Sequence, residues 1–156
     1  MSEELMKGKE MTKARQAYLE LRKRQQKEVE DFPIAYAFSE QQLEEALQEL
    51  NATKEECISL FGCGGILKKE DVPAFEQMMA RHAKELRDAI KSKEFAEAVF
   101  LYEMDNHEYA INWTGDEDVL GCFSLDWKTL EELDLVGAYN RARKQHMKNA
   151  EKCGMI

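Results

Sequence analysis

The sequence predicts an α+β fold, in which a mostly helical single domain holds a small antiparallel sheet and carries an N-terminal helical extension. Long stretches of good helix formers lack glycine and proline, short apolar runs flank one cluster of glycines, and capping residues precede several amphipathic segments. A chain of 156 residues suits one domain with an appendage. We expect residues 1–31 to form the extension and residues 32–156 to form the α+β core domain with a basic C-terminal helix.

Residues 9–30 are predicted to form a helix that has a thin apolar stripe. Met11, Ala14, Tyr18 and Leu21 recur at helical spacing, and the other faces are charged. Such a stripe suits a helix that lies along a domain, or one that forms a homodimer through residues 9–30. The helix is expected to end before Pro33, because the residue before a proline is disfavoured in the α conformation.

The predicted sheet comes from three short apolar runs. Ser39 and Gln42 form a capping box that starts a helix running to Leu50, with Asn51 as its C-cap. Gly62, Gly64 and Gly65 lie between two of the runs and indicate a hairpin with a turn at positive φ. The expected strands are residues 34–38, 57–61 and 66–68.

The second half is predicted to be helical. Asp71 starts one helix, and a helix from about residue 94, apolar on two faces, should be the core helix; it is expected to turn polar from Glu103, emerge at an edge and end at Thr114 and Gly115. Shorter helices follow at 116–121, 126–133 and 135–152. The predicted core is Phe38, Leu43, Leu47, Ile58, Leu60, Phe75, Met79, Leu86, Ile90, Phe95, Val99 and Tyr102.

The charge of the chain is unevenly distributed. The net charge is −9, but residues 94–134 hold twelve acids and one base, whereas residues 135–156 hold five bases and one acid. We expect the basic tail to fold back on the acidic stretch. A second acidic set lies on the outward face of the 40–50 helix, at Glu40, Glu44, Glu45 and Glu49.

The acidic stretch supplies the candidate partner-binding residues. Clustered carboxylates either solvate a surface or imitate a phosphate backbone and occupy a basic groove. Replacing Asp116, Glu117 and Asp118 by lysine is expected to leave the fold intact and to distinguish these alternatives, and the 40–50 helix offers the alternative contact face. The candidates are Glu103, Asp105, Glu108, Asp116, Glu117, Asp118, Glu131, Glu132 and Asp134.

We find no recognisable catalytic signature and expect no cofactor and no metal. Glu103 and His107 are spaced i,i+4, which is metal-ligand geometry, so a small metal-dependent enzyme that uses them with Asp105 stays an alternative. His82 is expected to be a core histidine and His146 a solvated one. Cys57, Cys63, Cys122 and Cys153 match no zinc-module spacing and are expected to be free thiols.

Several segments resemble an uncharacterised family of small proteins carried by phages and mobile elements of gut bacteria. Residues 1–30 look like an extension to that family, and the segment after Gly121 matches it less well. The family supplies no established activity, but it implies a setting in which small acidic proteins block host defence nucleases. The resembling stretches are 34–39 with the helix that follows, 62–71, 75–90 and 101–116, within about residues 32–135.

These observations favour a non-enzymatic, cytoplasmic, acidic binding protein of a phage or mobile element. Its expected partner is a host nucleic-acid-handling protein with a basic groove, such as a CRISPR effector nuclease or a restriction enzyme. The net charge of −9 disfavours direct binding to nucleic acid, and the composition predicts no membrane span and no secretory signal. The second alternative is a self-associating accessory or regulatory protein whose carboxylates only solvate it.

Overall fold

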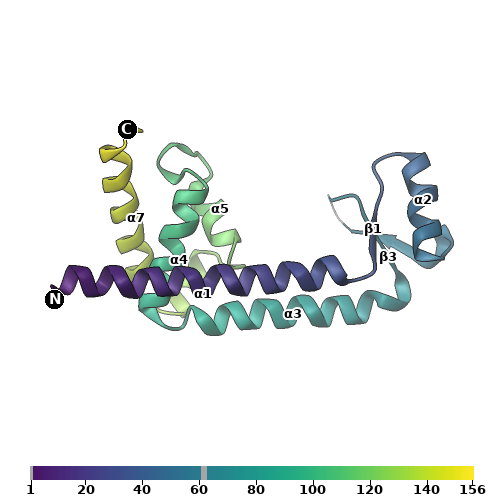
Figure 1. The fold of residues 1–156 in the computed structure, drawn as a ribbon, viewed down its shortest axis with the longest axis horizontal. Helices are drawn as coiled ribbons and strands as arrows, with labels where there is room; N and C mark the ends of the chain where they lie inside the picture. The colour runs from purple at the N-terminus through teal and green to yellow at the C-terminus, as the bar shows by residue number, and fades with distance from the viewer. Residues whose placement is uncertain (1, 61–62) are drawn as a thin grey trace. The chain divides into compact units, whose positions relative to one another are not determined.

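The computed structural model describes residues 2–60 and 63–156 and confirms a mostly helical α+β fold with a small antiparallel sheet (Figure 1). The chain divides into two compact units. Unit 1 comprises Met1–Arg22 and Ala83–Ile156, and unit 2 comprises Lys23–His82. Helices α1 (Glu3–Asp31) and α3 (Val72–Ala89) contribute residues to both units. The predicted domain boundary at residue 31 coincides with the end of α1, while the units divide at residues 22 and 82.

Unit 1 is helical, and side-chain caps start two of its helices. The Ser92 hydroxyl accepts a hydrogen bond from the Phe95 amide, and the Asp126 carboxylate accepts one from the Thr129 amide. Glu108, at φ 51°, lies just after the C-cap of α4. In addition to its parts of α1 and α3, unit 1 contains α4 (Lys93–Asn106), α5 (Gly115–Gly121), α6 (Trp127–Glu132) and α7 (Val136–Lys152), with a 3₁₀ turn at Tyr109–Ile111.

The core of unit 1 is built around α4, as its two apolar faces predict. Phe100 is fully buried, with its ring 5.1 Å from that of Phe123 and 5.4 Å from that of Tyr139. Tyr18 on α1 stacks on Phe123 at 5.7 Å, so the apolar stripe of the first helix packs within this unit. Helices α4 and α7 lie side by side (Figure 1).

Unit 2 holds the sheet, which consists of β1 (Ile34–Tyr36), β2 (Cys57–Ser59) and β3 (Gly65–Lys68) in the order β1-β3-β2. Both pairings are antiparallel, and Leu67 lies opposite Ile34 and Ile58. One helix, α2 (Glu40–Leu50), covers the sheet with a small core of Ala35, Ala46, Leu50 and Ile66. The unit also contains the 3₁₀ turns Lys54–Glu56 and Lys69–Asp71.

The local signals that predicted unit 2 are confirmed by its hydrogen bonds. The Ser39 hydroxyl accepts from the Gln42 amide, the Gln42 side chain accepts from the Phe38 amide, and Asn51 caps α2 at φ 51°. The 62–65 cluster gives Gly64 at φ 70° between β2 and β3. Phe61 and Gly62, which fall in the predicted strand and turn, lie outside the described residues.

Several sequence predictions are wrong. Phe38, Ile58 and Met79 are exposed rather than in the core. Phe38 lies beyond the end of β1, which stops at Tyr36, and Ile58 lies on the edge strand β2. Met79 lies on α3 beside the buried stripe of Met78, His82 and Leu86. The core helix ends at Asn106 rather than at Thr114, and Glu103 is buried rather than at an edge.

Within the described residues, no helix is both long and apolar enough to cross a membrane.

Candidate functional site

The nine predicted partner-binding carboxylates do not form one exposed group. Glu103 is buried, and Asp116 and Asp118 are half-buried. Three of the nine therefore point their charge into the fold of unit 1 rather than toward a partner. The exposed members are Asp105, Glu108, Glu117, Glu131, Glu132 and Asp134.

The basic C-terminal helix neutralises part of the acidic stretch, as its charge predicted. Arg141 Nε on α7 lies 2.9 Å from Oε2 of Glu97 on α4, and Lys7 Nζ lies 3.1 Å from Oε1 of the same carboxylate. Glu97 is only 8% exposed, and a buried carboxylate needs such partners to remain charged. Lys93 Nζ pairs with Asp134 at 2.7 Å.

Asp116 and Asp118 are structural acceptors. Asp116 Oδ1 accepts hydrogen bonds from the hydroxyls of Tyr109 at 2.7 Å and Tyr139 at 2.6 Å. Burial and the Asp116 carboxylate together raise the pKa of both phenols. Asp118 Oδ2 accepts from Asn112 and from the hydroxyl of Thr114. The premise that all three carboxylates at 116, 117 and 118 are exposed is therefore wrong for Asp116 and Asp118, and lysine at these two positions would break internal hydrogen bonds.

His146 is buried at 3% exposure, which corrects the prediction that it is solvated. Its Nε2 accepts the Ala110 amide hydrogen at 3.1 Å, so Nδ1 carries a proton and donates to Asp105 Oδ1 at 2.7 Å. The histidine lies on the face of α7 that packs against α4. The basic residues next to it in the sequence therefore do not indicate whether its side chain is exposed. Asp105 thus contacts His146, whereas Glu103 contacts His107.

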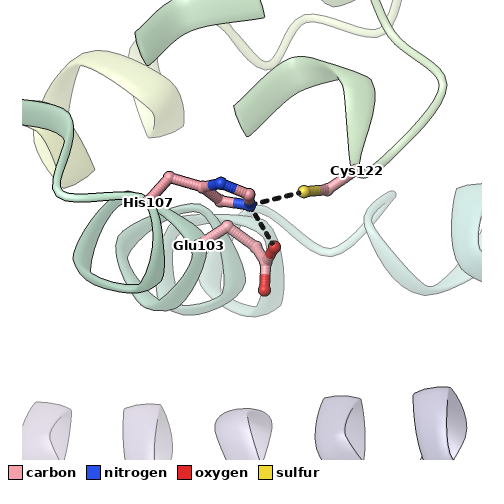
Figure 2. Close-up of side chains that lie close together, drawn as sticks. All are labelled: Glu103, His107 and Cys122. Atoms are coloured by element: carbon pink, nitrogen blue, oxygen red, sulfur yellow. Dashed lines mark hydrogen bonds and ion pairs between the residues drawn. The ribbon is translucent and has the colours of Figure 1, made fainter. Parts of the chain in front are cut away.

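A third cluster combines Glu103, His107 and Cys122 (Figure 2). Glu103 and His107 lie one turn apart at the end of α4, and Cys122 is the C-cap residue of α5. His107 Nε2 lies 3.4 Å from Glu103 Oε2 and 3.3 Å from Cys122 Sγ, and one ligand-type atom from each residue lies within 4.8 Å of the other two. The predicted i,i+4 pair is brought together, while Cys122 takes the place predicted for Asp105.

The surroundings of Cys122 disfavour its thiolate. Burial, followed by the nearby Glu103 carboxylate, raises the pKa of Cys122 to about 12, and the thiol donates a hydrogen bond to the Asp118 carbonyl at 3.3 Å. A neutral thiol is a poor nucleophile, so the raised pKa of Cys122 does not favour nucleophilic catalysis by this residue. The arrangement instead offers three atoms of ligand type that converge on one point.

Tyr18 on α1 adds an unusual group next to this cluster. Its side chain is 1% exposed, and its hydroxyl has no hydrogen-bond partner among the described residues. Burial first and the charge of Glu103 second raise the pKa of this hydroxyl, and Cys122 contributes in the same direction. A buried hydroxyl without a partner costs about 1–3 kcal/mol, so its position needs an explanation.

Unit 2 presents a different surface. An apolar hollow of about 540 Å³ lies between α2 and the sheet and is lined by Leu43, Leu47 and Ile58, among others. Phe38 at its rim is 76% exposed. Glu40 also lines the hollow, and all four carboxylates of the outward α2 face are exposed: Glu40, Glu44, Glu45 and Glu49.

His82 in unit 2 is a core histidine, as predicted. It is buried, its Nε2 lies 3.3 Å from Glu28 Oε2, and its carbonyl accepts from the Gln25 amide group at 3.0 Å. Arg81 donates to both oxygens of Glu28. The Arg81 hydrogen bonds, with a smaller contribution from His82, lower the pKa of Glu28 to about 2.

The chain belongs to a family of unknown function, DUF7659, which matches residues 17–146. This match confirms the expectation of an uncharacterised family. No curated protein and no solved structure matches the chain.

Proposed function

We propose that the protein is a non-enzymatic binding protein that occupies a basic surface of a partner protein through unit 2. The observation that carries this proposal is the exposed Phe38 beside an apolar hollow whose bordering helix displays four carboxylates. Interfaces of this kind take their affinity from a few aromatic anchors and their association rate from complementary charge.

The charge distribution favours unit 2 over unit 1. Residues 23–82 hold twelve acids and seven bases, a net charge of −5, whereas the other 96 residues carry −4. In unit 1, Arg141, Lys7 and Lys93 pair with carboxylates of the acidic stretch. The outward face of α2, rather than the 94–134 stretch, is thus the better candidate contact face.

The partner chemistry that fits is a basic groove with an accessible apolar side chain. Glu40 and Glu44 lie one turn apart beside Leu43 and Leu47, so a basic segment can pair with the carboxylates while an apolar residue enters the hollow. In its specific form, the proposal is that the protein acts in the cytoplasm, is encoded by a phage or mobile element and blocks a host defence nuclease by covering its nucleic-acid groove. The exposed carboxylates Glu108, Glu117, Glu131 and Glu132 remain a second candidate surface.

A matched pair of charge reversals tests this assignment. Tagged wild-type protein, the α2 variant E40K/E44K/E45K/E49K and the unit 1 variant E108K/E117K/E131K/E132K are used to capture proteins from the natural host, with quantitative mass spectrometry as readout. Within α2, E40K opposes the helix dipole while E49K favours it, so the stability effects offset. The proposal predicts that a nucleic-acid-handling protein is lost only with the α2 variant.

Two single variants compare the aromatic anchors. Phe38 borders the hollow, whereas Trp113 is fully exposed in the loop between α4 and α5. We expect F38A to weaken capture of the same partner at least tenfold and W113A to leave it within about twofold, since anchor residues cost about 2 kcal/mol or more when truncated. Loss of the partner with W113A and with the unit 1 reversal, but not with F38A, would move the contact to unit 1.

A further inference from the structure

We propose that Glu103, His107 and Cys122 form a binding site for a borderline-soft divalent cation, with Zn²⁺ preferred. The site lies in unit 1 and is independent of the partner surface proposed for unit 2. It therefore goes beyond the proposed function, and either proposal can fail without the other.

The first support is the separation of the three ligand atoms (Figure 2). Zn²⁺ bonds of about 2.3 Å to sulfur and about 2.0–2.2 Å to nitrogen and oxygen place tetrahedral ligands about 3.3–3.6 Å apart. His107 Nε2 lies 3.3 Å from Cys122 Sγ and 3.4 Å from Glu103 Oε2. These two separations need adjustments of only a few tenths of an ångström, and the ligand atoms of Glu103 and Cys122 lie within 4.8 Å of each other. The i,i+4 spacing holds two of the ligands on one helix face.

The second support is the chemistry of the donor set. A thiolate, an imidazole and a carboxylate together suit zinc, whereas Mg²⁺ and Ca²⁺ prefer oxygen ligands. Glu103 is buried and the other two are half-buried, so the carboxylate is held in place where its charge needs compensation. A cation would supply that positive charge. On binding it would displace the thiol proton of Cys122 to solvent, because a metal-bound thiol is deprotonated.

The third support comes from Tyr18, a residue outside the ligand set. Its ring packs against Tyr102, the residue before Glu103, at 5.9 Å and against Phe123, the residue after Cys122, at 5.7 Å, and its buried hydroxyl lacks a hydrogen-bond partner among the described residues. Three protein ligands leave the fourth position of a tetrahedral zinc ion to water. We infer that the Tyr18 hydroxyl hydrogen-bonds the ligand in this fourth position, which explains why a tyrosine rather than a phenylalanine is buried here.

Co²⁺ is the spectroscopic probe that tests this site, on full-length protein purified without a histidine tag and stripped with a chelator. The wild type should bind one Co²⁺ per chain, with a thiolate-to-metal charge-transfer band and the intense visible absorption of tetrahedral cobalt, and Zn²⁺ should displace it. Zn²⁺ at 100 times its dissociation constant should also raise the melting temperature by about 5–10 °C.

Three variants locate the site and one serves as the control. C122S should abolish the charge-transfer band, E103Q should weaken Zn²⁺ binding more than the roughly 100-fold that a supporting group costs, and Y18F should weaken it about tenfold. C153S changes an exposed cysteine and should leave the spectrum unchanged. Each stripped variant is first shown to be folded by circular dichroism, and E103Q keeps the size of the side chain should C122S not fold.

Two results would overturn the proposal. One is a folded, stripped wild type that shows no charge-transfer band and no Zn²⁺-dependent rise in melting temperature; the three side chains would then be a hydrogen-bonded cluster. The other is a band that survives in folded C122S or disappears in C153S, because the metal would then be bound elsewhere.

Discussion

The half-buried and buried carboxylates of the 94–134 stretch in unit 1 and the carboxylates of α2 in unit 2 have different surroundings. In unit 1, Glu97, Asp116 and Asp118 accept hydrogen bonds or ion pairs from groups of the same unit. In unit 2, the four carboxylates of α2 are exposed, and one of them, Glu40, lines the apolar hollow. The local density of acids in a sequence therefore does not identify the surface that is available to a partner. In the densest acidic stretch, several carboxylates serve as internal hydrogen-bond acceptors or ion-pair partners.

The largest expected effect on stability is the loss of Asp116. D116A leaves the hydroxyls of Tyr109 and Tyr139 without their acceptor, and Tyr139 is fully buried. We expect the free energy of unfolding to fall by about 2–4 kcal/mol. Denaturant unfolding followed by circular dichroism measures this change.

The adjacent E117A is the control for D116A. Glu117 is exposed, so its loss should change the free energy of unfolding by less than about 0.5 kcal/mol. Equal effects of the two variants would show that Asp116 is not an internal acceptor and would remove the contrast between the units.

A smaller effect is expected at the turn that holds the hollow in unit 2. Gly64 has φ 70°, and a Cβ there would lie 2.5 Å from Cε1 of the Phe38 ring. G64A should destabilise unit 2 by about 1–2 kcal/mol, because a left-handed conformation costs alanine about 1 kcal/mol and Phe38 must move. Hydrogen exchange of the β3 amides measures the change.

The Phe38 contribution can be separated from the backbone cost. G64A/F38A relieves the contact with the ring and should recover part of the loss. If the loss of unfolding free energy in the double variant equals the sum of the losses in G64A and F38A, Phe38 does not pack on this turn.

The smallest effect is the pH dependence contributed by Glu28. The pKa of Glu28 is lowered to about 2 by Arg81 and His82, so its contribution is complete above the ordinary glutamate pKa near 4.5 and is lost as pH falls from there toward 2. E28Q should therefore remove part of the acid sensitivity of unit 2. Hydrogen exchange of the β3 amides between pH 3 and pH 6 compares E28Q with E76Q, which alters an exposed carboxylate on α3. The same loss in both variants would contradict a specific role for Glu28.

Local signals in the sequence predicted the elements well. The Ser39–Gln42 capping box and the glycines before β3 each act within a few residues, so the local sequence determines the conformation there. The core helix was predicted because both faces of α4 are apolar, which is again a local property.

The features that were missed depend on packing between distant segments. Cys122 lies 15 residues from His107, and Tyr139 lies 23 from Asp116, so no spacing rule indicates either contact. The burial of His146 depends on which face of α7 meets α4, and the basic residues beside it concealed that face. Two of the three ligands of the candidate metal site, the i,i+4 pair, were visible as a motif, while the third required the fold.

The salt dependence of partner binding tests the central claim most directly, namely that unit 2 displays its carboxylates to a basic partner. The affinity of the captured partner is measured at several salt concentrations for the wild type and for both quadruple reversals. We expect wild-type affinity to fall steeply with salt and E40K/E44K/E45K/E49K to abolish measurable binding. E108K/E117K/E131K/E132K should keep the affinity within about twofold and leave the salt slope unchanged. An affinity that is independent of salt, or a loss of binding with the unit 1 reversal alone, would contradict this claim.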